Sequence, residues 1–206
     1  MTNDLLICGK YILMPQASTY ARGVEALHSV SVKRPFTFKE NLQARVEAYE
    51  SGDYSLFDTW LNSCTGIAYK DDSTEFKLIP ACAELIDIDK DRVYFSLPID
   101  YSRITGVELD SSKGKYNQGL TNAEILKHPA WLALVEGDRA LLRTYTDIVF
   151  SAYVAKYGSR DKLMAFYVRG KVWTDELRGV FAHNLRFKAD VSGDANFSKC
   201  SLFLHR

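Results

Sequence analysis

One cysteine in this sequence is placed where a nucleophile could work. Catalysis by a thiol needs a base, usually histidine, that the fold brings close to it. Among the four cysteines, Cys64 is the best candidate because it follows an aromatic segment and directly precedes Thr65-Gly66. The candidate bases are His28, His128 and His183. A buried structural thiol is the competing interpretation, and the sequence favours it.

The aspartates of the segment 87–91 have the spacing that opens a calcium-binding loop. Such a loop also needs a glycine at its sixth position and a bidentate acid at its twelfth. Here those positions hold Arg92 and Pro98. We therefore interpret the segment as a charged turn between strands at 83–88 and 93–99.

Two further motifs are incomplete. Ser159 and Lys162 match the SxxK pattern of serine nucleophiles, but the partner motifs SDN and KTG are absent. The basic segment 113–115 would need a glycine at 109 and a serine or threonine at 116 to form a P-loop, and the chain has Leu109 and Tyr116. No metal-ligand spacing of histidine or cysteine occurs either. The sequence predicts no cofactor and no metal.

Charge is unevenly distributed along the chain. The totals of 26 basic and 26 acidic residues cancel. Residues 1–100 hold 10 basic and 15 acidic residues, for −5, whereas residues 101–206 hold 16 and 11, for +5. Basic side chains could contact an anionic partner. The candidate binding residues are Lys156, Arg160, Lys162, Arg169 and Lys171.

Aromatic residues are interleaved with these basic ones, as in surfaces that stack on bases or pack on a protein. The alternative is that the basic part folds against the acidic part and that the aromatics are core. Tyr153, Phe166 and Phe181 fall on predicted apolar faces, which favours core. No RNP, KH, zinc-finger or helix-turn-helix pattern indicates specific nucleic-acid recognition.

Composition sets the broad class. The chain has 206 residues, of which 47% are hydrophobic and 25% charged, which excludes disordered and fibrous proteins. Asp4 stands where a secretory signal would be basic, and no apolar stretch approaches the roughly 18 residues that span a bilayer. The dispersed cysteines do not resemble a disulfide framework. We expect a cytoplasmic protein without membrane contact.

The first half is predicted to be mixed. Residues 5–14 and 24–34 resemble strands. Thr37 and Glu40 form a capping box, which predicts a helix that Gly52 can end. A short helix is expected from Ser55, then β structure over 65–99 and a long loop over 100–119.

The second half is predicted to be mainly helical. Thr121 and Glu124 form a second capping box, and Pro129 suits the first turn of the next helix. Apolar spacing predicts a long helix from about residue 139 to Gly158 and then a strand over 164–169. Thr174 is expected to cap a helix with Leu177, Val180 and Phe181 on its buried side. Residues 185–191 and 197–204 are expected to pair as a terminal hairpin.

Together these elements predict an α+β fold: a compact single domain over 1–206 with a mixed or antiparallel sheet and about five helices. A subdivision near 100–120 would separate an acidic β-rich part (1–100) from a basic helix-rich part (120–206).

Function is not readable from motifs. The leading hypothesis is a non-catalytic intracellular binding protein whose basic, aromatic-rich C-terminal part contacts a protein or a nucleic acid. One alternative is a small hydrolase or transferase with Cys64 as nucleophile. The other is a structural subunit of an assembly, which the aromatic content of 13% would suit.

Overall fold

The structure is a computed structural model that describes residues 6–8, 11–14, 20–29, 34–88, 96–195 and 203–205. Its larger sheet has the strand order β6-β4-β3-β8-β9-β7, with β5 paired to β8. A smaller sheet has the order β1-β2-β10. The strands of the larger sheet are β3 (Leu61–Tyr69), β4 (Glu75–Ile79), β5 (Leu97–Pro98), β6 (Val107–Asp110), β7 (Phe166–Tyr167), β8 (Glu176–Ala182) and β9 (Val191–Ala195). Those of the smaller sheet are β1 (Leu6–Cys8), β2 (Tyr11–Met14) and β10 (Phe203–His205).

Helices cover the larger sheet. The described residues form the α-helices α1 (Tyr20–Ser29), α2 (Phe38–Glu50), α3 (Ala83–Ile86), α4 (Asn122–Ile125), α5 (Pro129–Leu134) and α6 (Arg139–Tyr157). They also form the 3₁₀ turns η1 (Ser55–Phe57), η2 (Tyr101–Arg103) and η3 (Leu185–Phe187). Strand pairs are antiparallel except β7 with β9, so the sheet is mixed. The predicted α+β class is confirmed.

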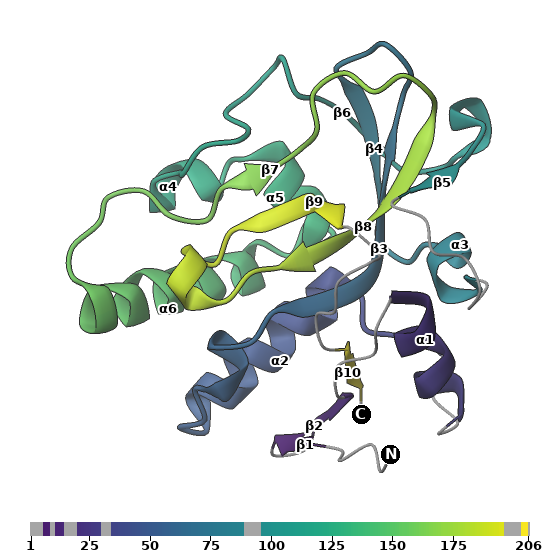
Figure 1. The fold of residues 1–206 in the computed structure, drawn as a ribbon. Coiled ribbons are helices and arrows are strands. Elements are labelled where there is room, and N and C mark those ends of the chain that lie inside the picture. Colours follow the sequence, from purple (N-terminus) through teal and green to yellow (C-terminus); the bar gives the residue numbers. More distant parts are fainter. Residues whose placement is uncertain are drawn as a thin grey trace.

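Strand β3 is buried along its whole length because helices lie on both sides of it. Ile67 belongs to the large core formed with α2, α5 and α6, whereas its neighbour Ala68 packs in a second cluster with α1 and α3. Figure 1 shows α1 and α3 on one side of β3 and α2, α5 and α6 on the other. Successive side chains of a strand point to opposite faces, which explains this division.

The predicted helix termini at α2 and α6 are confirmed. Thr37 accepts a hydrogen bond from the Glu40 backbone, and Glu40 accepts one from the Thr37 backbone. Asp138 caps α6 by accepting from the Leu141 backbone, and Gly158 ends α6 with φ +90°. Such a positive φ favours glycine. The second predicted capping box, at the start of α4, is also present.

The helix predicted from Thr174 is wrong, because this segment is strand β8 between β3 and β9. The register with β9 shifts between Gly179 and Phe181. This irregularity breaks the two-residue period of a strand. Leu177, Val180 and Phe181 consequently have a spacing that imitates a helix.

Several other boundaries were also wrong. Residues 20–29 form helix α1 rather than a strand, and residues 83–86 form helix α3. Residues 89–91 of the predicted charged turn and residues 93–95 of the predicted strand at 93–99 lie outside the described residues; within the rest of that predicted strand, Leu97–Pro98 form β5. The segment from Ser55 is a 3₁₀ turn, and the predicted loop 100–119 contains η2 and β6.

The predicted terminal hairpin is wrong as well. Residues 185–187 form η3, and β9 pairs with β8 and β7. Strand β10 instead pairs with β2, so Phe203 lies opposite Met14. The pairing of β2 with β10 joins segments almost 190 residues apart, which a local pattern could not indicate.

Arg45 on α2 is a fully buried cation, with 0% of its surface exposed. Its Nε donates to the Leu56 carbonyl at 3.1 Å, and its Nη1 donates to the Tyr145 hydroxyl at 2.8 Å. Its Nη2 donates to the carbonyls of Thr59 at 2.7 Å and His183 at 3.0 Å. One side chain thus connects α2, η1, α6 and the end of β8.

Replacing Arg45 with methionine should lower the free energy of unfolding by about 3 kcal/mol, because buried acceptors would lose their donors. Urea denaturation measures this change. The matched control is Arg143→Met on the exposed face of α6, which should change stability by less than about 0.5 kcal/mol. Equal stability of the two variants would contradict the assigned role of Arg45.

Candidate functional site

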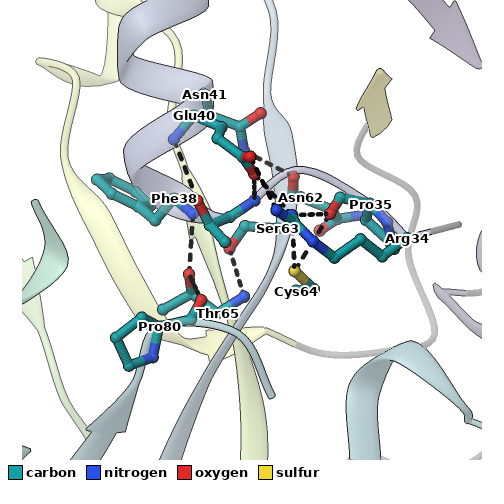
Figure 2. Close-up of polar contacts among 11 residues, drawn as sticks. Arg34, Pro35, Phe38, Glu40, Asn41, Asn62, Ser63, Cys64, Thr65 and Pro80 are labelled. Carbon is teal, nitrogen blue, oxygen red and sulfur yellow. Dashed lines mark hydrogen bonds and ion pairs between the residues drawn. The ribbon is translucent and has the colours of Figure 1, made fainter. Parts of the chain in front are cut away.

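Cys64 lies on β3 against the segment that leads into α2 (Figure 2). Its thiol is buried and donates to the Pro35 carbonyl at 3.2 Å. The Arg34 guanidinium lies 3.9 Å from the sulfur and makes two bonds to the Glu40 carboxylate, at 2.7 and 2.9 Å. The sulfur therefore sits beneath an ion pair rather than at an open surface.

Side-chain hydrogen bonds hold this seam between α2 and β3 together. The Thr65 hydroxyl accepts from the Phe38 backbone at 2.8 Å and donates to the Pro80 carbonyl at 2.7 Å. The Asn41 amide donates to the Asn62 carbonyl at 2.8 Å. The bonds of Phe38 and Asn41 join the start of α2 to β3, and the bond to Pro80 joins β3 to the residue after β4, so these three bonds hold the packed elements together.

The electrostatics of Cys64 fit a structural thiol. Burial raises the pKa of Cys64 to about 11, and the favourable effect of Arg34 on the thiolate offsets only part of this. The candidate bases make their contacts elsewhere: His28 is exposed on α1, His128 packs on Tyr116, and His183 stacks on Phe181. A thiol with so high a pKa is protonated at neutral pH and is a poor nucleophile.

The five predicted basic residues are divided between two places. Lys156, Arg160 and Lys162 lie at and just after the end of α6, whereas Arg169 and Lys171 lie in the connection from β7 to β8. Figure 1 shows the end of α6 at the left and this connection at the top of the sheet. The structure does not bring the five side chains into one patch.

Ion pairs between the acidic and basic parts of the chain neutralise some of these charges. Lys156 contacts Asp58 at 2.7 Å, and Lys171 contacts Asp72 at 2.8 Å. In the opposite sense, Lys39 lies 3.9 Å from Asp138 and Lys77 lies 3.5 Å from Glu108. The −5 and +5 parts of the sequence are thus interleaved in space, as the alternative interpretation of the charges expected.

Exposed apolar side chains gather at one end of the molecule, which we call the aromatic end. It is formed by the C-terminal parts of α2 and α6 together with η1 and η3, at the left of Figure 1. The Lys156–Asp58 ion pair joins α6 to the residue after η1, and the Asn184 amide donates to the Asp58 carbonyl at 3.3 Å. Of the eight exposed large apolar side chains among the described residues, this end carries Tyr54, Trp60, Val154, Tyr157 and Phe187.

An apolar groove of about 410 Å³ opens at the aromatic end. Tyr49 forms its aromatic wall, with ring centroids 5.1 Å from Tyr54 and 5.9 Å from Phe57. The Lys156–Asp58 pair stands at the rim. The groove is lined by Tyr49, Tyr54, Phe57, Asp58, Ser151, Ala152, Ala155, Lys156 and Leu185. Of these, sequence reasoning had selected only Lys156.

A cluster of four rings adjoins the groove beyond Asp58. Trp60 lies 4.8 Å from His183, 5.3 Å from Phe187 and 6.0 Å from Phe181, measured between ring centroids. Burial, together with the charge of Arg45, lowers the pKa of His183 to about 4. Neither ring nitrogen of His183 has a hydrogen-bond partner among the described residues. His183 therefore serves as a neutral ring in this cluster.

A larger cleft of about 620 Å³ lies between β6, the loop after it and α5. Its acids are paired with lysines: Glu75 with Lys70 at 2.5 Å, and Asp110 with Lys113 at 3.1 Å. Within the described ranges, no three His, Cys, Asp or Glu side chains are arranged to hold a metal ion. We favour the groove over this cleft as the candidate site, because a ligand that covers the apolar lining of the groove would remove apolar surface from water.

The raised pKa of Cys64 should make its alkylation slow. At pH 7.5 we expect iodoacetamide to react with Cys64 in the folded protein about two orders of magnitude more slowly than with free cysteine. Mass spectrometry of peptides from a time course measures the rate, and the urea-unfolded chain is the control in which the difference should vanish. Rapid alkylation of Cys64 in the folded protein would support the enzyme alternative instead.

His183 should make the fold sensitive to acid. Its pKa is lower in the folded protein than in the unfolded chain, so the unfolded state binds more protons between pH 6.5 and 4. The wild type should lose about 2 to 3 kcal/mol across this window relative to His183→Phe, a variant that keeps the ring but cannot titrate. Urea denaturation at pH 7 and pH 4.5 measures the difference. Parallel pH profiles would show that His183 does not titrate in this way.

Comparisons with known proteins identify the fold and not a family. No protein-family model matches the chain, and no curated protein sequence matches it. A solved structure from a study of the accommodation of massive sequence variation in Nanoarchaeota by the C-type lectin fold is similar, with a TM-score of 0.70 and 12% sequence identity. The match covers 96% of this chain and 99% of that one. Among the described residues, no helix has the length and hydrophobicity to cross a bilayer. The chain has a C-type lectin-like α+β fold.

Proposed function

We propose that this chain is a non-catalytic binding protein whose contact surface is the aromatic end. The observation that carries the proposal is an apolar groove with Tyr54 in its wall and a ring cluster beside it in which Trp60 and Phe187 are exposed. Scattered apolar side chains are ordinary on protein surfaces, but their accumulation in one place marks an interaction site. Tyrosine and tryptophan are also the residue types that contribute most to binding at interfaces.

The lining of the groove indicates what it would hold. Its volume lies within the range of small-ligand and side-chain pockets, and such pockets combine an apolar wall with a few polar groups that orient the ligand. Here the Lys156–Asp58 pair at the rim is the polar element. We therefore expect an apolar or aromatic group of the partner to enter the groove while a charged group remains at the rim.

Basic side chains around the aromatic end favour an acidic group on that partner. Arg160 follows the end of α6 and Lys188 follows η3, and the positive charge of each offsets part of the rise that burial causes in the pKa of Asp190. Arg186 is exposed beside the groove residue Leu185. A protein segment with an apolar side chain next to an acidic one would fit this arrangement. Of the basic residues predicted from the sequence, Lys156 and Arg160 thus belong to the proposed contact face, whereas Arg169 and Lys171 lie outside it.

The fold supports a binding role. The similar Nanoarchaeota structure is described as a C-type lectin fold that accommodates massive sequence variation. In the present chain Arg45 bonds to the backbone carbonyls of Thr59 and His183, so exposed side chains nearby could change without loss of these bonds. A scaffold with variable surface residues suits recognition better than a fixed chemical step.

The groove can be tested with 1-anilinonaphthalene-8-sulfonate, an apolar dye that carries one negative charge. We expect the folded wild type to bind it with increased, saturable fluorescence. Ala155→Trp, which places a large side chain in the groove, should weaken binding at least tenfold, and Lys156→Glu should weaken it less.

The matched control is Trp173→Ala, which removes an exposed aromatic side chain outside the groove and should bind the dye as the wild type does. Circular dichroism would verify that each variant is folded. Equal binding by wild type and Ala155→Trp, or no binding at all, would refute the groove as the contact site.

A further inference from the structure

Strand β6 forms one edge of the larger sheet, since among the described residues it pairs with β4 alone. Figure 1 shows β6 beside β4 at the top of the sheet. The outer side of an edge strand presents backbone N–H and C=O groups that no neighbouring strand satisfies. Two hydrogen bonds near the ends of β4 identify the residues of β6 that carry these groups.

The first bond runs from the Ser111 backbone to the Thr74 carbonyl at 2.9 Å and extends the β4–β6 ladder by one pair. Hydrogen-bonded and non-bonded pairs alternate along an antiparallel ladder. Leu109 therefore bonds to β4, whereas the backbone groups of Glu108 and Asp110 point away from it.

The second bond gives the same result from the other side of β4. The Lys70 backbone donates to the Glu75 carbonyl at 3.4 Å, so the backbone groups of Glu75 and, two residues on, of Lys77 point toward β3. In the register with β6, Glu75 lies opposite Asp110 and Lys77 lies opposite Glu108. Neither pair is hydrogen-bonded across the ladder, which confirms that Glu108 and Asp110 face outward.

Three of the four outward backbone groups have no protein partner. The Asp110 carbonyl accepts from the Lys113 backbone at 3.0 Å. Within the described part of the chain, the N–H of Asp110 and both backbone groups of Glu108 make no hydrogen bond. A row of free donors and acceptors at strand spacing is complementary to the backbone of another extended chain.

The cleft of about 620 Å³ borders this edge. Glu108, Leu109 and Asp110 all line it, and successive side chains of a strand point to opposite faces, so the cleft must pass along the edge between the faces. Tyr116 and Pro129 belong to its wall. A four-residue strand, with about 3.4 Å per residue, about 4.8 Å to its neighbours and about 10 Å between packed sheets, occupies about 650 Å³. The cleft thus has room for one short strand but not for the further strands of a second sheet.

We propose that the outer edge of β6 binds an extended segment of a partner protein, which adds an antiparallel strand to the larger sheet. The lysines and acids of the cleft are paired within the chain and do not identify a ligand. The free backbone groups do so, because only an extended backbone offers the matching series of donors and acceptors. This inference is independent of the groove at the aromatic end.

The side chains of β6 define which segment would fit. Directly opposite residues of paired strands share a face of the sheet. Leu109 packs against the core cluster that contains Tyr116, so the partner residue opposite Leu109 should be apolar. Its two neighbours would lie opposite Glu108 and Asp110, and we expect them to be polar residues with a preference for strands, such as threonine.

The probe is the uncharged peptide acetyl-Ser-Thr-Leu-Thr-Ser-amide. Titration of isotope-labelled protein with up to about 5 mM peptide should shift the backbone amide NMR signals of Glu108 and Asp110 in a saturable way. In the proposed pairing the N–H groups of both threonines face β6, and that of the leucine faces away. N-methylation of both threonines should therefore abolish binding, whereas N-methylation of the leucine alone, the matched control, should preserve it.

A variant tests the same edge from the protein side. Glu108→Pro removes an outward N–H that takes no part in the β4–β6 ladder, so the sheet should persist while peptide binding weakens at least tenfold. Glu108→Thr loses the carboxylate but keeps the N–H and should bind as the wild type does. The amide spectrum verifies that both variants are folded.

Equal binding of the unmethylated and the threonine-methylated peptide would overturn the proposal. So would the absence of a saturable shift in the wild type, because recognition through the backbone does not depend on one particular side chain. Shifts of the same amides on concentrating the protein alone would assign the edge to a second copy of this chain instead. None of these outcomes would affect the dye experiment on the groove.

Discussion

The buried guanidinium of Arg45 is the interaction on which the rest of this architecture depends. An isolated charge in a protein interior is unfavourable unless its donors are satisfied. Here backbone carbonyls from two separate turns and the hydroxyl of Tyr145 satisfy it. Because the buried charge needs these acceptors, the turns that carry them must keep their positions relative to α2 and α6. Because the same turns carry Trp60 and flank the groove, the buried cation positions the aromatic end without reaching its surface.

Elements with local signals could be predicted from the sequence, and elements defined by distant partners could not. The capping boxes of Thr37 and Thr121 and the glycine after α6 each depend on residues close together in the sequence. All three helix termini were therefore predicted correctly. Strand β8 was mistaken for a helix because the irregularity at Gly179 comes from its pairing with β9. The β2–β10 pair was missed because its members lie at opposite ends of the chain.

The candidate site shows the same limit. Lys156 was selected for its charge, but the groove it borders is made by Tyr49, Tyr54 and Leu185, which come from three separate segments. No spacing rule joins such residues; only the packing of α2 on α6 and of η3 on α6 does so. An aromatic residue after Gly52-Asp53, in a turn, was the signal available for Tyr54. The two halves of the sequence differ in net charge, but in the folded protein ion pairs such as Lys171–Asp72 place basic residues of one half beside acidic residues of the other.

The pairing of Met14 with Phe203 has a consequence for how the chain reaches this fold. Contacts between residues so distant in sequence form late, since nearly the whole chain must be closed into a loop first. During synthesis β2 would have β1 as its neighbour until residues 203–205 emerge, with its other edge available to other chains. Completion of the smaller sheet therefore requires β10, and a chain that lacks residues 203–205 would leave this edge of β2 exposed.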